Sequence, residues 1–348
     1  MAQIDKPNLY FNTKLYTGNG GTQSITGVGF QPDLVWIKNR ERVEDHILYD
    51  AVRGATKRIS SNNTNAESTK SNGVTAFDSD GFSLGSAGQN NYNGDAIASW
   101  NWKANGQGSS NTTGTINTTY TSANTTSGFS IIKFTGNGTG SATIGHGLGT
   151  KPRMIMLKNL TDADSWIVWF DTNGSNTSNG RMSINASSVA ETTANSMITV
   201  SDTLITLPSL VNAAWNGSSK DYVVYAFANI KGFSKFGSYK GNGNTDGPFC
   251  YTGFSPAYIW IKSTTYAGNW LCFDNQREVQ NRPSGNPLNL NETGVESANA
   301  NYAIDFLSNG FKLRNNNGNI QNNTETMIYM SFAKHPIVGS NDIPATAV

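Results

Sequence analysis

The chain has 348 residues and a formal net charge of +1, and only 14% of its residues are charged, against about 25% in a typical globular protein. This balance argues against a nucleic-acid-binding protein, which would concentrate Lys and Arg. No apolar run approaches the roughly 18 residues of a membrane span, so we expect no membrane insertion. The N-terminus has neither a basic nor an apolar region, so no signal peptide is predicted.

One ordered set of motifs occurs three times along the chain. Each copy starts with a Gly-Asn-Gly motif, at residues 18–20, 136–138 and 241–243. A Pro-led apolar run ending in Lys follows, at residues 32–38, 152–158 and 256–262. An apolar segment then closes on Asp50, Asp171 or Asp274, which lie 12, 13 and 12 residues after that Lys. A period near 100 residues indicates tandem domains rather than a solenoid.

Short apolar runs alternate with Gly, Asn and Ser clusters, which predicts an all-β fold of three tandem antiparallel β-sandwich modules that are jelly-roll-like. We place the modules at residues 1–104, 128–232 and 233–336. Residues 105–127 are predicted to be a Thr/Asn/Gly/Ser-rich linker, and residues 337–348 a C-terminal tail. The Asn-Gly pair of each copy is predicted to form a tight hairpin turn.

The Pro-to-Lys strand is apolar on both faces, because side chains alternate along a strand. Val35 and Ile37 share the aliphatic face, which we assign to the sandwich interior together with its counterparts in the other copies. The opposite face has large side chains and ends in a charge. Its candidates for contact with a ligand or another subunit are Trp36, Lys38, Met156, Lys158, Trp260 and Lys262. The alternative is that a loop covers this face.

Candidates for catalysis or metal binding are weak. The candidate acidic pairs are Asp78/Asp80, Asp162/Asp164 and Glu292/Glu296. No pair recurs between the copies, so exposure to solvent explains these carboxylates better than catalysis does. A Ca²⁺-binding loop at Asp162/Asp164 is the alternative for the second pair. The three His residues have no metal-ligand spacing. We therefore expect no enzyme, no metal and no cofactor. Cys250 and Cys272 are expected on neighbouring strands, as buried free thiols in preference to a disulfide.

Several segments resemble a module common in structural and tail-fibre proteins of tailed bacteriophages, especially marine ones. They include residues 26–40, 48–54, 80–84 and 98–103, with looser matches at residues 128–131, 145–149 and 331–336. The resemblance implies a virion component, assembled in the host cytoplasm. It further implies a place on the tail and a homo-oligomer, with a trimer favoured.

The expected function is a tail fibre or tail appendage used in host attachment, with tail or baseplate proteins as partners. One alternative is a capsid decoration or head-fibre protein. A second is a carbohydrate-binding, lectin-like module that recognises a host-surface glycan. The copies differ most in the loops at residues 40–46, 172–181 and 275–287, where recognition is expected because loops diverge on a kept scaffold.

Overall fold

The computed structural model describes residues 3–172, 179–277, 285–321 and 324–339. Antiparallel sheets dominate this part of the chain, and its α-helices are single turns: α1 (Gly88–Asn91), α2 (Ala213–Asn216) and α3 (Gly318–Gln321). The expected all-β fold is confirmed. No helix in these residues is long and apolar enough to cross a membrane.

Module 1 is a sandwich of two unequal sheets. Its large sheet has the order β1 (Phe11–Thr17), β9 (Ala96–Trp102), β3 (Leu34–Asn39), β4 (Ile47–Asp50), β5 (Lys57–Ser60) and β6 (Ser68–Thr69). Its small sheet has the order β2 (Gln23–Thr26), β8 (Gly81–Leu84) and β7 (Val74–Asp78). Val35 and Ile37 pack between the two sheets with Ile25 and Phe82, as the strand alternation predicts.

Modules 2 and 3 repeat this plan. The large sheet of module 2 contains β10 (Tyr120–Asn124), β11 (Phe129–Thr135), β18 (Asp221–Ala228), β13 (Pro152–Asn159), β14 (Ile167–Asp171) and β15 (Asn179–Met182); its small sheet contains β12 (Thr143–Gly145), β17 (Leu204–Thr206) and β16 (Thr199–Val200). The large sheet of module 3 contains β19 (Ser234–Lys240), β26 (Thr326–Pro336), β21 (Phe254–Ser263), β22 (Leu271–Asp274) and β23 (Leu288–Asn289); its small sheet contains β20 (Phe249–Tyr251), β25 (Gly310–Leu313) and β24 (Ile304–Leu307). In every module the Pro-to-Lys strand lies beside the closing strand.

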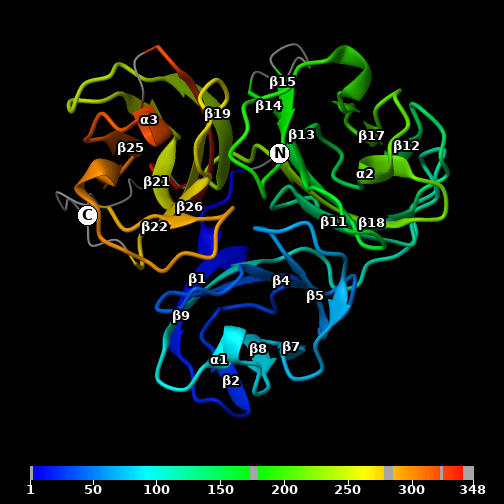
Figure 1. Ribbon diagram of the computed structural model, residues 1–348, viewed down its shortest axis with the longest axis horizontal. Helices are drawn as coiled ribbons and strands as arrows, with labels where there is room; N and C mark the ends of the chain where they lie inside the picture. The colour runs from blue at the N-terminus through cyan, green and yellow to red at the C-terminus, as the bar shows by residue number, and fades with distance from the viewer. Residues whose placement is uncertain (1–2, 173–178, 278–284, 322–323, 340–348) are drawn as a thin grey trace.

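The three modules surround a common centre, with the large sheets inside and the small sheets outside (Figure 1). Three aromatic rings meet at this centre: Trp102, Phe227 and Phe332, each from the closing strand of its module. Their ring centroids are 5.7, 6.0 and 6.4 Å apart, and each pair is edge-to-face. The three residues occupy the same register position, because they pair with Leu34, Met154 and Tyr258, each four residues before the repeated Lys. The chain therefore forms an internal pseudo-trimer.

One hydrophobic cluster runs through the centre and joins all three modules. Phe11 of module 1 stacks on Phe332 of module 3 with centroids 5.1 Å apart, and Trp36 meets Trp260 edge-to-face at 5.3 Å. Burial of such large rings is the main favourable term in folding and stabilises each by about 1.5–3 kcal/mol. The modules therefore depend on one another for much of their core.

Two local expectations need correction. The predicted linker contains β10, which pairs with β11, and Ile116 of this stretch is buried and bridges to Ile144 of β12. Residues 105–127 thus belong to module 2. The Asn-Gly turns do place Gly20, Gly138 and Gly243 at positive φ. The strands on either side of each turn, however, lie in different sheets of the sandwich, so the turns are not hairpins.

Candidate functional site at the module junctions

The six predicted contact residues all lie at junctions between modules of the same chain. They are buried, with exposed fractions of 0–2%: Trp36, Lys38, Met156, Lys158, Trp260 and Lys262. The face that was expected to meet a loop, a ligand or another subunit is therefore covered by the neighbouring module. The tail at residues 337–348 lies mostly outside the described residues, as do parts of two of the loops in which recognition was expected.

The three lysines act as equivalent clamps. Lys158 donates hydrogen bonds to the carbonyls of Asn159 at 2.9 Å and Asp164 at 3.0 Å, and reaches Thr64 of module 1 at 3.1 Å. Lys262 binds two carbonyls of its own module and Ser187 of module 2. Lys38 likewise binds Thr293 of module 3. Each ammonium thus crosses one junction, and module 1 closes the ring on module 3.

Burial lowers the pKa of each clamp lysine to about 8. An ammonium has three donors, and each of these finds a carbonyl acceptor. No carboxylate of the described residues forms an ion pair with any of the three lysines. The carbonyl acceptors therefore compensate for burial at all three, and the charges of Glu44 and Asp45 act in addition on Lys38, as does that of Asp164 on Lys158. The arrangement indicates a structural role at the junctions.

A second repeated contact runs beside the clamps. Trp166 donates through Nε1 to the carbonyl of Ser60 at 2.8 Å, and Trp270 donates to the carbonyl of Ser183 at 3.0 Å. His46 replaces this Trp in module 1. The equivalence follows from the backbone, because the N–H of His46, like that of Trp166 and Trp270, donates to the side-chain oxygen of an Asn. The Nδ1 atom of His46 accepts from Nε1 of Trp36 at 3.2 Å, which fixes the neutral ring. Burial, aided by the charges of Lys38 and Arg277, holds its pKa well below the ordinary value.

Two of the three junctions also contain a buried ion pair. Between modules 1 and 2, Arg53 pairs with Asp50 at 2.5 Å, and the hydroxyl of Tyr225 from module 2 donates to Asp50 at 2.6 Å. Burial alone would lower the pKa of Arg53, but Asp50, Tyr225 and Glu67 outweigh it, so this pKa is raised.

The junction between modules 3 and 1 repeats this group. Arg277 pairs with Asp274 at 2.5 Å, and Nε1 of Trp100 from module 1 donates to Asp274 at 3.0 Å. Both charged side chains are fully buried. Glu296 completes the group by pairing with Arg277 at 3.2 Å and with Arg40 of module 1 at 2.6 Å.

The junction between modules 2 and 3 lacks this charged group. Phe170 stands where Asp50 and Asp274 stand, because it pairs with Met154 as Asp50 pairs with Leu34 and Asp274 with Tyr258. The 13-residue offset to Asp171 therefore marks a substitution, and the sequence alignment of Asp171 with the other two Asp residues was wrong by one position.

The Glu of the charged group is also replaced at this junction. Ala190 stands where Glu67 and Glu296 stand, since all three donate their backbone N–H to the residue two positions after a clamp lysine. At this junction, therefore, uncharged residues stand at both of the described positions that carry a carboxylate at the other two junctions.

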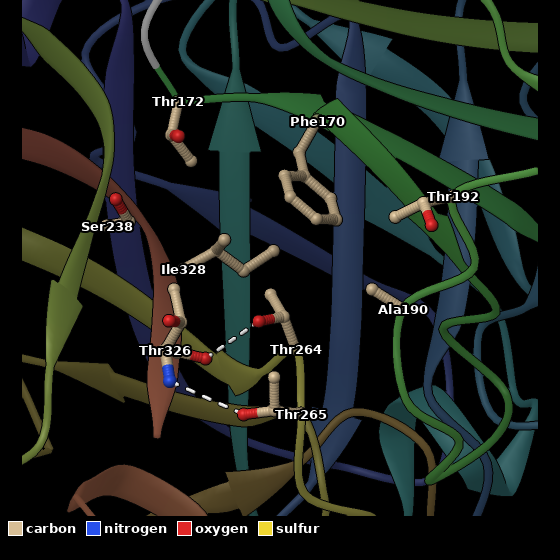
Figure 2. Close-up of a pocket in the computed structure, with 9 residues that line it drawn as sticks. All are labelled: Phe170, Thr172, Ala190, Thr192, Ser238, Thr264, Thr265, Thr326 and Ile328. Carbon is tan, nitrogen blue, oxygen red and sulfur yellow. Dashed lines mark hydrogen bonds between the residues drawn. The ribbon is translucent and has the colours of Figure 1, made fainter. Parts of the chain in front are cut away.

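A pocket of about 350 Å³ lies at this junction. Figure 2 shows Phe170 of β14 and Ile328 of β26 among hydroxyl-bearing side chains. In module 2 these follow β14 and β15, and in module 3 they lie in β19, directly after β21 and in β26. The lining residues are Phe170, Thr172, Ala190, Thr192, Ser238, Thr264, Thr265, Thr326 and Ile328. This site was not predicted from the sequence. The sequence contains one signal for it, the Lys-to-Asp offset of 13 residues in the second copy, which is 12 in the other two.

The acidic pairs have structural roles. The carboxylate of Asp80 accepts the backbone N–H groups of Gly27 and Gly29, which lowers its pKa. Asp162 pairs with Lys220, and Glu292 accepts from Asn289. Within the described residues, no three His, Cys, Asp or Glu side chains are grouped so as to hold a metal ion.

The two thiols are free and buried, as predicted. They do not lie on neighbouring strands, however. Cys250 is in β20 of the small sheet of module 3 and packs in the interior of that module, whereas Cys272 is in β22 of the large sheet and faces the common centre. Burial raises the pKa of Cys250 to about 12, so this thiol is unreactive at neutral pH.

Comparison with known proteins gives one match. No curated protein matches the chain, and no solved structure does. One family model, described as a domain of unknown function (DUF7483), matches residues 6–336. This match spans all three modules, so the chain belongs to the DUF7483 family.

Proposed function

We propose that this protein is a bacteriophage virion component, a tail fibre or tail appendage used in host attachment. The observation that carries the proposal is the common core, which makes three β-sandwiches into one body with the large sheets inside and the small sheets outside. A body of this kind suits the display of surfaces on a particle, which requires stability and not a reaction. The phage-like segments support the same assignment.

Assembly with tail or baseplate proteins is part of the proposal. Because the six residues first assigned to subunit contact are used between modules, a homotrimer of this chain has to use other surfaces. Its neighbours therefore bind the small sheets or the loops, which face outward in Figure 1. The capsid decoration or head-fibre alternative places the same body on the head.

The test is localisation on purified particles. An antibody raised against the isolated protein is applied to virions with gold labelling, and the virion proteins are identified by mass spectrometry. We expect peptides of this chain in the virion and label on the tail. Label on the head selects the decoration alternative, and absence of the protein from purified virions overturns the proposal.

A further inference from the structure

We infer that the pocket between modules 2 and 3 binds a neutral, hydroxyl-rich ligand of the size of one sugar ring. The inference goes beyond a place on the virion, and it is tested on the isolated protein. The three junctions are related by the pseudo-threefold arrangement. The two junctions with a buried ion pair therefore serve as references for the junction between modules 2 and 3, which has a pocket.

The two reference junctions each contain a buried ion pair that involves the position of Phe170. Arg53 and Asp50 have no exposed side-chain surface, and neither do Arg277 and Asp274. At the third junction Phe170 replaces the Asp and Ala190 replaces the Glu. Both acidic side chains are thus absent here, Ala190 is smaller than the Glu it replaces, and a pocket of about 350 Å³ lies beside these two residues, a volume within the range of ligand pockets.

The chemistry of the lining selects the ligand class. Six of the nine lining side chains carry a hydroxyl, and none carries a charge. Charged ligands would lose their hydration without gaining a counter-charge. Hydroxyl groups both donate and accept, so they match a ligand that presents several hydroxyls of its own. A purely apolar ligand would leave this ring of polar groups without partners.

The polar groups are positioned for such a ligand. The hydroxyl of Thr264 donates to the carbonyl of Thr326 at 2.9 Å, and Thr265 donates to Glu325. The Thr265 oxygen already accepts the backbone N–H of Thr326 at 3.4 Å, so the two hydroxyls offer their remaining acceptor lone pairs at one side of the pocket (Figure 2). Ser238 and Thr192 lie on opposite walls, and their hydroxyls bond to no other described residue, which leaves them available as donors and acceptors.

Phe170 and Ile328, which are 7% and 2% exposed, supply a small apolar part of the lining among these hydroxyls (Figure 2). A sugar ring has an apolar face of C–H groups and a rim of hydroxyls, so it fits an aromatic surface enclosed by Thr and Ser. A second depression, lined by Asn, Ser and Thr residues that include Thr112, has hydroxyls without any aromatic side chain. It provides a matched control within the same chain.

The experiment is ligand-observed saturation-transfer NMR with the full chain. The probes are free glucose, galactose, mannose and N-acetylglucosamine at millimolar concentration, with glucuronate as an anionic probe. The variants are Thr192→Phe and Ser238→Phe, which place a large side chain over the pocket from its two exposed walls. Thr112→Phe is the control variant, and thermal melts confirm that each variant is folded.

We expect at least one neutral sugar to bind, with binding at least tenfold weaker in T192F and S238F and unchanged in T112F. Three results overturn the inference: no neutral sugar binds the wild-type chain, the two pocket variants bind the sugar as tightly as the wild type does, or glucuronate binds more tightly than every neutral sugar. None of these results bears on whether the protein is found in virions, so failure here and failure of the proposed function are distinguishable.

Discussion

Replacing a clamp lysine tests whether the junctions hold the three modules together. Met is similar to Lys in length but has no donor, so Lys158→Met leaves the carbonyls of Thr64, Asn159 and Asp164 without their shared partner. These three hydrogen bonds are 2.9–3.1 Å long and lie in a site closed to solvent.

The magnitude follows from two opposing terms. A pKa lowered from 10.5 to about 8 corresponds to a cost of about 3 kcal/mol for burying the charge. Three hydrogen bonds from a charged donor contribute about 1.5–3 kcal/mol each. Removing the ammonium relieves the first term and loses the second, so we expect the free energy of unfolding to fall by about 1.5–6 kcal/mol.

The assay is equilibrium denaturation in urea, followed by Trp fluorescence. Lys240→Met is the matched control, because Lys240 is exposed at the end of β19, and we expect it to change stability by less than about 0.5 kcal/mol. Lys38→Met and Lys262→Met repeat the test at the equivalent positions. If all three variants are as stable as the control, the reasoning on carbonyl clamps is refuted.

The common core predicts one cooperative transition for the whole chain in differential scanning calorimetry; three separate transitions would contradict it. Tyr225→Phe removes the hydroxyl that donates to Asp50 at 2.6 Å, so urea denaturation should show a loss of about 1–3 kcal/mol, against almost none for Tyr92→Phe at the surface. The folded state keeps His46 neutral while the unfolded state takes up a proton below about pH 6.5, so stability should fall as pH falls through that value; a His46→Gln variant should lose less stability than the wild type over the same range. Lys158 binds its proton less tightly in the folded state, so between about pH 8 and 10.4 the wild type should gain stability relative to Lys158→Met, and a constant difference would refute the lowered pKa.

Much of the fold could be predicted from the sequence because strand alternation is local. Val35 and Ile37 lie in a sandwich interior, and the three Pro-to-Lys segments occupy equivalent strands. What covers the opposite face could not be predicted, because an apolar face that ends in Lys is the same pattern under a loop, a second subunit or another module. Only the arrangement of the modules in space decides among these.

The candidate site was less accessible to prediction for a different reason. Aligning Asp171 with Asp50 and Asp274 keeps the residue type, whereas the strand register aligns Phe170 with them. Backbone pairing of β13 with β14 places Phe170 at the equivalent position, and Asp171 lies one position later, where its side chain points to the other face of the strand. The linker was misread because a Thr-rich polar stretch gives no apolar period, although β10 pairs along it and Ile116 is buried.

Covalent fusion of the three modules explains why the site exists only once. In a homotrimer every junction is built from the same residues, so a substitution that opens one junction opens all three. In a single chain the junctions vary independently: two retain the buried Asp–Arg pair, and the third, with Phe170 and Ala190, gives up that pair and gains a pocket. The hydrogen bonds of Lys262 and the contacts of the aromatic centre still hold modules 2 and 3 together at this junction. The loss of charge is therefore tolerated where the remaining contacts suffice, and specialisation of one junction is a consequence of joining the modules in one chain.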